Sequence, residues 1–142
     1  MLVLDTDHLS VLEWEASSTT QRLLARLSRI APDQAATTII NFEEQLRGWL
    51  AYVARMRSVT QQVEAYRRLK RHLDNYRAII VLEFDLRAAT EFQRLRKRHR
   101  TLGTMDLKIA AIVLANDATL LSRNLTDFGK IPELKVEDWT AE

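Results

Sequence analysis

Residues 103–121, GTMDLKIAAIVLANDATLL, decide the fold that we expect for this chain. The part that follows Asp106 is apolar nearly all round a helix, which is typical of a helix buried against a sheet. The run 119–121 that comes next has the composition of a short buried strand. The stretch therefore predicts a buried helix that leads into a strand of a central sheet.

Similar apolar runs recur along the chain and predict five strands, at residues 2–4, 36–40, 78–82, 119–121 and 134–136. Segments with helical spacing separate these runs. An alternating order of strands and helices argues for an α/β fold with a largely parallel sheet and right-handed crossovers.

Two long helical patterns follow one another between the second and third expected strands. Apolar residues at intervals of three and four run from Asn41 to Met56, and a second such set runs on to Tyr76. Ser58 with Gln61 fits a capping box, which places the start of a new helix at this point. The segment therefore predicts a helical hairpin.

The composition limits the class of protein. A length of 142 residues with 46% hydrophobic content suits one domain that spans residues 1–142. The lack of cysteine excludes disulfides and a cysteine nucleophile, and it favours an intracellular compartment. Acids near the N-terminus speak against a signal peptide, and no stretch approaches the roughly 20 apolar residues of a membrane span. We expect a soluble, cytoplasmic protein without a membrane partner.

The formal charge of +2 hides an uneven distribution of charged residues. Residues 47–100 contain 14 of the 21 Lys and Arg but 5 of the 19 Asp and Glu, a net charge of +9. Such a basic segment would attract a polyanion such as RNA. The same residues are also compatible with ordinary solvated helix faces, and charge alone does not decide between the two.

Acidic residues stand next to the ends of several apolar runs. Asp5 follows the run 2–4 directly, and Glu44, Asp106 and Asp127 lie near the other runs. If these runs are strands of one parallel sheet, the acids gather at its carboxyl edge, where α/β proteins bind ligands. Carboxylate oxygens are hard ligands that Mg²⁺ and Mn²⁺ prefer. The pattern therefore predicts a divalent-metal site.

Each acid also has a purely structural explanation. Asp7 suits the N-cap of a short first helix, Glu44 fits a capping box, and Asp106 suits the first turn of a helix. Asp127 suits a surface turn. Separate caps need not converge, however, whereas Asp5 directly follows a buried strand. It is the set as a whole that favours a functional site.

The chain also carries an ordered set of motifs: LDTDHLS at residues 4–10, T-x5-E-x3-G at Thr38, Glu44 and Gly48, the segment 105–134, and KVEDW at residues 135–139. This set resembles PIN-domain ribonucleases, and more closely the VapC-type toxins of bacterial toxin–antitoxin pairs. The resemblance covers essentially the full chain. It implies a three-layer α/β/α PIN-like fold, with residues 1–142 as a single nuclease domain.

The resemblance also implies roles for individual residues. Asp5, Glu44 and Asp106 match the three acids that the family uses around its divalent metal. The fourth position stays open, because this chain has Asn124 where several relatives have aspartate. Either Asp127 supplies the charge or Asn124 binds through its amide oxygen.

Two hydroxyl residues have places near these acids. Thr6 and Ser122 could hydrogen-bond to metal-bound waters or to phosphate oxygens. Contacts that cap helices or close turns explain them equally well.

The activity that the resemblance implies is Mg²⁺-dependent endoribonuclease activity, with Mn²⁺ as a possible substitute. Water activated by the metal would hydrolyse an RNA phosphodiester, and transfer RNA or a structured RNA hairpin is the expected substrate class. The expected partner is a small antitoxin, one helix of which fills a groove between the hairpin and the first helices. A homodimer is also implied.

Two other hypotheses fit parts of the sequence. A degenerate PIN-like module would bind RNA or a protein through the basic face without catalysis, and Asn124 is the best support for it. Alternatively, Asp5-Thr6-Asp7 imitates the nucleophile motif of haloacid-dehalogenase-type phosphatases, although Leu9 stands at the fifth position of that motif. Metal titration and activity on small phosphate esters would separate these alternatives.

Overall fold

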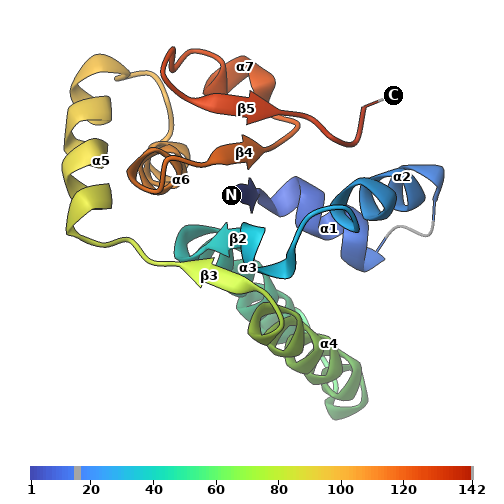
Figure 1. The fold of residues 1–142 in the computed structure, drawn as a ribbon. Coiled ribbons are helices and arrows are strands. Elements are labelled where there is room, and N and C mark those ends of the chain that lie inside the picture. The colour runs from blue at the N-terminus through green and yellow to red at the C-terminus, as the bar shows by residue number, and fades with distance from the viewer. Residues whose placement is uncertain (15–16, 142) are drawn as a thin grey trace.

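The computed structural model describes residues 1–14 and 17–141 and has a five-stranded sheet at its centre (Figure 1). The strand order is β3-β2-β1-β4-β5, and all four pairs of neighbouring strands in the described residues are parallel. The strands are β1 Leu2–Leu4, β2 Ala35–Thr38, β3 Ile80–Leu82, β4 Thr119–Leu121 and β5 Lys135–Glu137. The predicted α/β fold with a largely parallel sheet is confirmed.

Helices cover both faces of the sheet. The helices α5 (Leu86–Arg98) and α6 (Thr104–Ala115) pack on one face, while α1 (Thr6–Trp14) and α2 (Ser18–Leu27) pack on the other (Figure 1). The predicted three-layer α/β/α architecture is therefore confirmed.

The alternation of side chains along the strands explains the layers. Val3 and Leu120 belong to the core on the α5–α6 side, whereas Leu4 and Leu121 belong to the core on the α1–α2 side. Successive side chains of a strand point to opposite faces, so a sheet that is covered on both faces needs continuous apolar strands. All four of these side chains are 1% exposed or less.

The second strand is shorter than predicted. We expected residues 36–40 to form a strand, but β2 ends at Thr38 and helix α3 (Ile39–Arg55) starts with Ile39. Thr38 is the N-cap of α3, since its Oγ1 accepts a 3.1 Å hydrogen bond from the backbone N–H of Asn41. The cap outweighs the strand preference of the two β-branched isoleucines.

The other strand boundaries differ by smaller amounts. Helix α4 (Val59–Arg77) runs almost to the third strand, which begins at Ile80 instead of the expected residue 78. The last strand spans Lys135–Glu137 and is thus shifted by one residue from the expected 134–136. The strands at 2–4 and 119–121 have the expected bounds.

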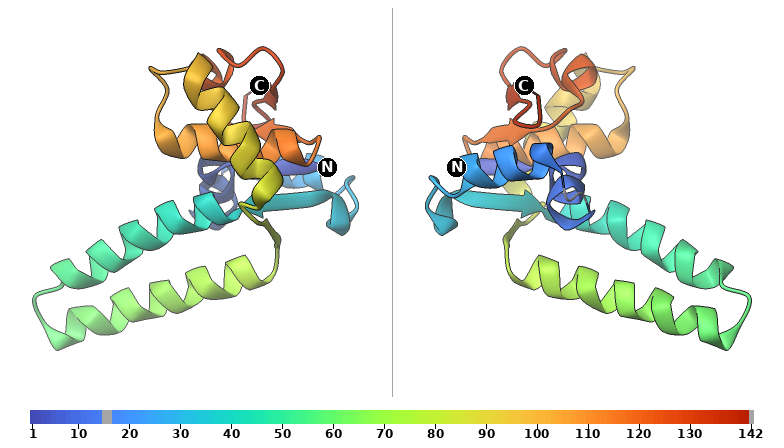
Figure 2. Two further views of the ribbon diagram at one scale, coloured as in Figure 1. Left: turned by 90° about the vertical axis from the view of Figure 1, so that its left-hand side faces the viewer. Right: turned by 90° about the vertical axis from the view of Figure 1, so that its right-hand side faces the viewer.

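The helices α3 and α4 form the predicted hairpin, which projects away from the sheet (Figure 2). Ser58 caps α4, because its side chain accepts a 3.1 Å hydrogen bond from the N–H of Gln61. The Gln61 side chain accepts a 2.8 Å hydrogen bond from the N–H of Arg57, one residue before the cap. The predicted break between the two helices at Ser58 is confirmed.

Two local features differ from expectation. Asp7 does not cap the first helix, since α1 begins at Thr6 and Asp7 lies within its first turn. A short helix, α7 (Leu125–Phe128), was not expected at all, and Asn124 caps it. A 3-10 turn (Pro32–Gln34) precedes β2.

None of the helices in the described ranges is both long and apolar enough to cross a membrane.

Candidate active site

The centre of the candidate site is the carboxylate of Asp5, at the carboxyl end of β1. The strands β1 and β4 are adjacent with Leu4 opposite Leu121, so the residues that follow them, Asp5 and Ser122, are neighbours. The Ser122 hydroxyl donates a 2.7 Å hydrogen bond to Asp5 Oδ2. The N–H of Asp5 donates in turn to the carbonyl of Leu121 at 2.9 Å.

The first turn of α3 fixes the other oxygen of Asp5. The side-chain amide of Asn41 donates to Asp5 Oδ1 at 2.8 Å and to the Thr6 hydroxyl at 3.1 Å. The N–H of Thr6 also donates to Asp5 Oδ1, at 2.9 Å. Asn41 is itself oriented by the Thr38 hydroxyl, which donates a 2.7 Å bond to its Oδ1. Asp5 therefore has one well-defined orientation.

The parallel topology brings the other expected acids to the same edge. Glu44 lies in the early part of α3, which starts where β2 ends, and Asp106 lies in the first turn of α6. Burial raises the pKa of Asp106, and the charges of Asp5 and Asp127 raise it further. Asp5, Asp106 and Asp127 come from separate segments, and Asp106 is thus close enough to the other two carboxylates to be repelled by them.

Glu44 and Asp5 belong to the same electrostatic cluster. Partial burial of its carboxylate raises the pKa of Glu44, and the charges of Asp5 and Asp106 raise it further. For Asp5, burial raises the pKa most, the Ser122 hydrogen bond opposes this shift, and the charge of Asp7 adds to it. The cluster is short of positive charge.

Both candidates for the fourth position, Asn124 and Asp127, lie in the region after β4. The Asn124 amide oxygen accepts a 3.4 Å bond from the N–H of Asp127 and so caps α7, while its amide nitrogen donates to Asp127 Oδ2 at 3.2 Å. Asp127 raises the pKa of Asp106 and lies 3.7 Å from the Lys130 ammonium. Asn124 thus holds Asp127, and Asp127 acts on the acidic cluster.

The donor set fits a hard divalent cation in ligand type and charge. Asp5, Glu44 and Asp106 offer carboxylate oxygens, and a cation among them would relieve their mutual repulsion. In residues 1–14 and 17–141, no three acidic or histidine side chains already stand at the spacing of a closed metal site. Glu44 is exposed as a residue, although part of its carboxylate is screened from solvent.

A second network beside the cluster was not anticipated from the sequence. His8 is completely buried, and its Nε2 accepts a 3.1 Å hydrogen bond from the N–H of Trp139. Its Nδ1 therefore carries the proton and donates to Asp7 Oδ1 at 2.7 Å. Asp7 Oδ2 accepts a 2.9 Å bond from the N–H of Arg123. This network ties the C-terminal segment and the loop after β4 to α1.

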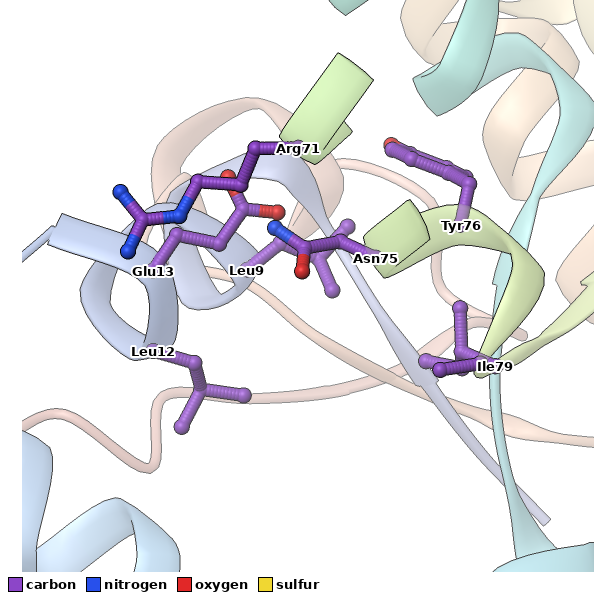
Figure 3. Close-up of a pocket in the computed structure, with 8 residues that line it drawn as sticks. Leu9, Leu12, Glu13, Arg71, Asn75, Tyr76 and Ile79 are labelled. Carbon is purple, nitrogen blue, oxygen red and sulfur yellow. The ribbon is translucent and has the colours of Figure 1, made fainter. Parts of the chain in front are cut away.

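A hollow of about 370 Å³ lies between α1 and the C-terminal end of α4 (Figure 3). Leu9 and Leu12 of α1 face Asn75 of α4 and Ile79 across it. Tyr76 forms part of its wall and donates its hydroxyl to Gln45 of α3. This hollow lies outside the acidic cluster, in the space between the hairpin and the first helix.

Comparison with known families gives one match that spans most of the chain. The PIN domain model matches residues 2–134. No curated protein matches the chain.

Solved structures share the fold over nearly the whole chain. DNA-bound VapBC from Salmonella typhimurium has a TM-score of 0.75 at 18% identity and covers 97% of both chains. VapBC2 from Rickettsia felis, bound to a promoter fragment, has a TM-score of 0.74 at 21% identity, over 97% of this chain and 98% of that chain. VapC20 from Mycobacterium tuberculosis, a sarcin-ricin loop cleaving toxin, has a TM-score of 0.53 at 14% identity, over 89% and 93%.

Proposed function

This chain belongs to the PIN-domain family, and we propose that it is a divalent-metal-dependent endoribonuclease that acts as the toxin of a toxin–antitoxin pair. The observation that carries the proposal is the proximity of Asp5, Glu44 and Asp106 at the carboxyl edge of the sheet: the charge of Asp5 raises the pKa of both Glu44 and Asp106, and the charge of Asp106 raises that of Glu44. Such a concentration of carboxylates is costly without a cation, and catalytic sites are where such shifts gather.

The residues have distinct roles in this proposal. Asp5 and Asp106 hold Mg²⁺, or Mn²⁺ in its place, and Glu44 accepts a proton or hydrogen bond from the attacking water. When bound, the cation supplies a Lewis acid that activates water and stabilises charge on the phosphoryl oxygens. Asp127 adds negative charge beside Asp106. Water adds to the phosphodiester, and its hydrolysis leaves two RNA fragments, one that ends in a phosphate and one that ends in a hydroxyl group.

The neighbours of Asp5 act by positioning it. Ser122 and Asn41 each donate a hydrogen bond to a different oxygen of Asp5, at 2.7 and 2.8 Å. Oδ2 accepts only the bond from Ser122 among the described residues and keeps a further lone pair for a cation, whereas Oδ1 also accepts from the N–H of Thr6. Thr6 contributes its backbone N–H to Asp5 and its hydroxyl as an acceptor for Asn41. These contacts hold the carboxylate still before a metal arrives.

Structured RNA is the substrate class that we propose. VapC20, a structural relative, is described as cleaving the sarcin-ricin loop, and the basic segment 47–100 has a net charge suited to a polyanion. The sarcin-ricin loop and transfer RNA are the two members of this class to be tested.

The test is cleavage of a labelled RNA with and without Mg²⁺. Asp5→Asn and Asp106→Asn remove a charged ligand with little change of shape, and each should lower the cleavage rate by about 100-fold or more. Asp117→Asn is the matched control, because Asp117 is exposed at the far end of α6 and its φ of 50° is one that asparagine tolerates. Full activity in either folded site variant would contradict the proposal.

For the antitoxin, we propose that one helix of it docks in the hollow between α1 and α4 (Figure 3). The apolar side chains of Leu9, Leu12 and Ile79 provide a surface for the apolar face of such a helix. A cationic side chain of the antitoxin would then enter the acidic cluster and block the metal. Equal RNA cleavage by the free protein and by its complex would contradict this model of inhibition.

A homodimer is also proposed, through the exposed face of α4. Val59, Val63, Tyr66 and Leu73 share one face of this helix and are 79%, 55%, 56% and 47% exposed. An apolar row of this kind is typical of an interface. Sedimentation of the purified protein should give the mass of two chains, and Tyr66→Glu should give the mass of one.

The two rival hypotheses gain less support. In a phosphatase of the haloacid-dehalogenase type, Asp7 would have to act on the substrate, but its carboxylate is engaged by His8 and by the N–H of Arg123. A degenerate module would not need the carboxylates of Asp5, Glu44 and Asp106, which are all present. We therefore favour catalysis.

A further inference from the structure

The basic residues of the segment 47–100 fall into two groups. On the hairpin, four cations are held by acids of the same helix, whereas Arg55, Arg57 and Arg77 have no acidic partner within 4.0 Å among the described residues. Arg47 contacts Glu43 at 2.6 Å, and Lys70 contacts Asp74 at 2.8 Å. Arg67 contacts Glu64 at 2.9 Å. These are ordinary pairs at spacings of three and four residues, so this part of the basic charge is locally balanced.

The C-terminal end of α5 carries three cations of the second group. Within residues 1–14 and 17–141, Arg96, Lys97 and Arg100 have no acidic partner within 4.0 Å. Arg94, by contrast, is held by Glu91 at 2.6 Å and Glu133 at 2.7 Å. Three cations without an acidic partner therefore lie close together in the sequence where α5 ends.

These cations surround a depression in the surface. Arg96, Lys97, His99 and Arg100 line a hollow of about 410 Å³ together with Leu102, Thr104 and Leu107. Arg96 also lies over the ring of Phe92, with its guanidinium carbon 5.4 Å from the ring centre, which limits its motion. The depression thus gathers several basic side chains, one of them stacked on an aromatic ring.

The hollow lies at the start of α6, the helix that carries Asp106. Thr104 is the first residue of α6 and lines the hollow, and Asp106 lies two residues later in the same helical turn. The connection between α5 and α6 lies on the same side of the molecule as the hairpin (Figure 2, left). Gly103 lies between Leu102 and Thr104, which both line the hollow, and a Cβ on Gly103 would be 3.9 Å from Oδ2 of Asp106. A strand that leaves the hollow across Gly103 would therefore reach the Asp106 carboxylate.

We propose that this hollow, the α5–α6 basic site, binds phosphates of the RNA strand next to the bond that is cut. The inference rests on the proposed nuclease function and assigns the part of the surface that holds the substrate. Cations attract the phosphates, while the acids of the cluster repel them unless a divalent metal is bound. The basic site thus supplies affinity, and the acidic cluster supplies the chemistry.

The test separates binding from cleavage. A fluorescent single-stranded RNA oligonucleotide is titrated with the full chain in EDTA, so that no cleavage occurs, at several salt concentrations. The double variant Lys97→Ala/Arg100→Ala should bind about 10-fold more weakly, and its salt slope should fall by about 0.7 for each phosphate that the variant no longer neutralises. The matched control is Arg67→Ala/Lys70→Ala, which removes two cations of the same types from acidic partners and should bind within about twofold of the unchanged chain.

Circular dichroism must show that both double variants are folded. Unchanged RNA binding by Lys97→Ala/Arg100→Ala, or an equal loss of affinity in the control, would overturn the inference. Binding of an acidic peptide to this site in place of RNA would overturn it as well. If RNA binding depends on Lys97 and Arg100 but the chain never cleaves RNA with Mg²⁺, the nuclease proposal fails and the binding site stands.

Discussion

The hydroxyl of Ser122 donates a 2.7 Å hydrogen bond to Oδ2 of Asp5 across the ends of two neighbouring parallel strands. The same oxygen of Ser122 accepts a 3.0 Å bond from the N–H of Asn124. One buried side chain therefore joins the central acid to Asn124, the N-cap of the helix that carries Asp127. This helix and β1 are far apart in sequence, and Ser122 sets their relative position.

Ser122→Ala should weaken Mg²⁺ or Mn²⁺ binding by roughly 10- to 100-fold, because Asp5 loses the donor that orients it. Calorimetric titration with Mn²⁺ measures the effect. Ser122→Thr keeps the hydroxyl and should restore most of the affinity. If Ser122→Ala binds the metal as well as the unchanged chain, the positioning role is wrong.

Asp106→Asn should stabilise the metal-free protein at neutral pH. The folded-state pKa of Asp106 lies above its ordinary value of 3.8, first because of burial and then because of Asp5 and Asp127. Its contribution to stability is therefore complete below the unfolded pKa and is lost as the pH rises through the folded pKa. Thermal melts in EDTA between about pH 4 and pH 7 should show the gain of the variant growing with pH. A constant difference across this range would contradict the account.

Divalent metal should raise the melting temperature of the unchanged chain. A ligand that binds the folded state alone adds about 2.7 kcal/mol of stability at a concentration of 100 times its Kd. Asp5→Asn and Asp106→Asn should lose most of this gain, whereas Asp117→Asn should keep it. Equal shifts in all four proteins would indicate that the metal binds elsewhere.

His8→Ala should destabilise the fold by about 2 to 4 kcal/mol, because it removes a fully buried ring and leaves the N–H of Trp139 without its acceptor. Chemical denaturation measures the total loss of stability. Amide hydrogen exchange locates it, and the Trp139 amide should lose more protection than that of Ala111 in the buried helix α6. Equal losses at the two amides would show that His8 does not hold the C-terminal segment.

Much of the fold could be predicted from the sequence because the strongest signals are local. The strands at 2–4 and 119–121 are continuous apolar runs, and α6 is apolar nearly all round. The end of β2 could not be predicted from composition, since Ile39 and Ile40 favour a strand and the cap by Thr38 decides for a helix. Boundaries of this kind depend on one hydrogen bond.

The candidate site, like the fold, could be predicted only in part from the sequence. The acids Asp5 and Asp106 could be predicted from their places beside a strand and at a helix start. The contacts of Asn41 with Asp5, and of His8 with Trp139, span 36 and 131 residues. A buried polar side chain looks the same in a single sequence as an exposed one, so only the folded chain identifies these partners. In hindsight, a polar Asn41 in the otherwise apolar turn that begins α3 was a usable signal.

The central claim is that Asp5 and Asp106 hold one divalent cation beside Glu44. The most direct measurement is anomalous scattering from crystals soaked in Mn²⁺, with crystals of Asp106→Asn treated in parallel. We predict one strong peak in contact with the carboxylates of Asp5 and Asp106 in the unchanged chain, and a weak peak or none in the variant. A fully soaked crystal with no peak at these carboxylates, or with manganese bound only elsewhere, would contradict the account.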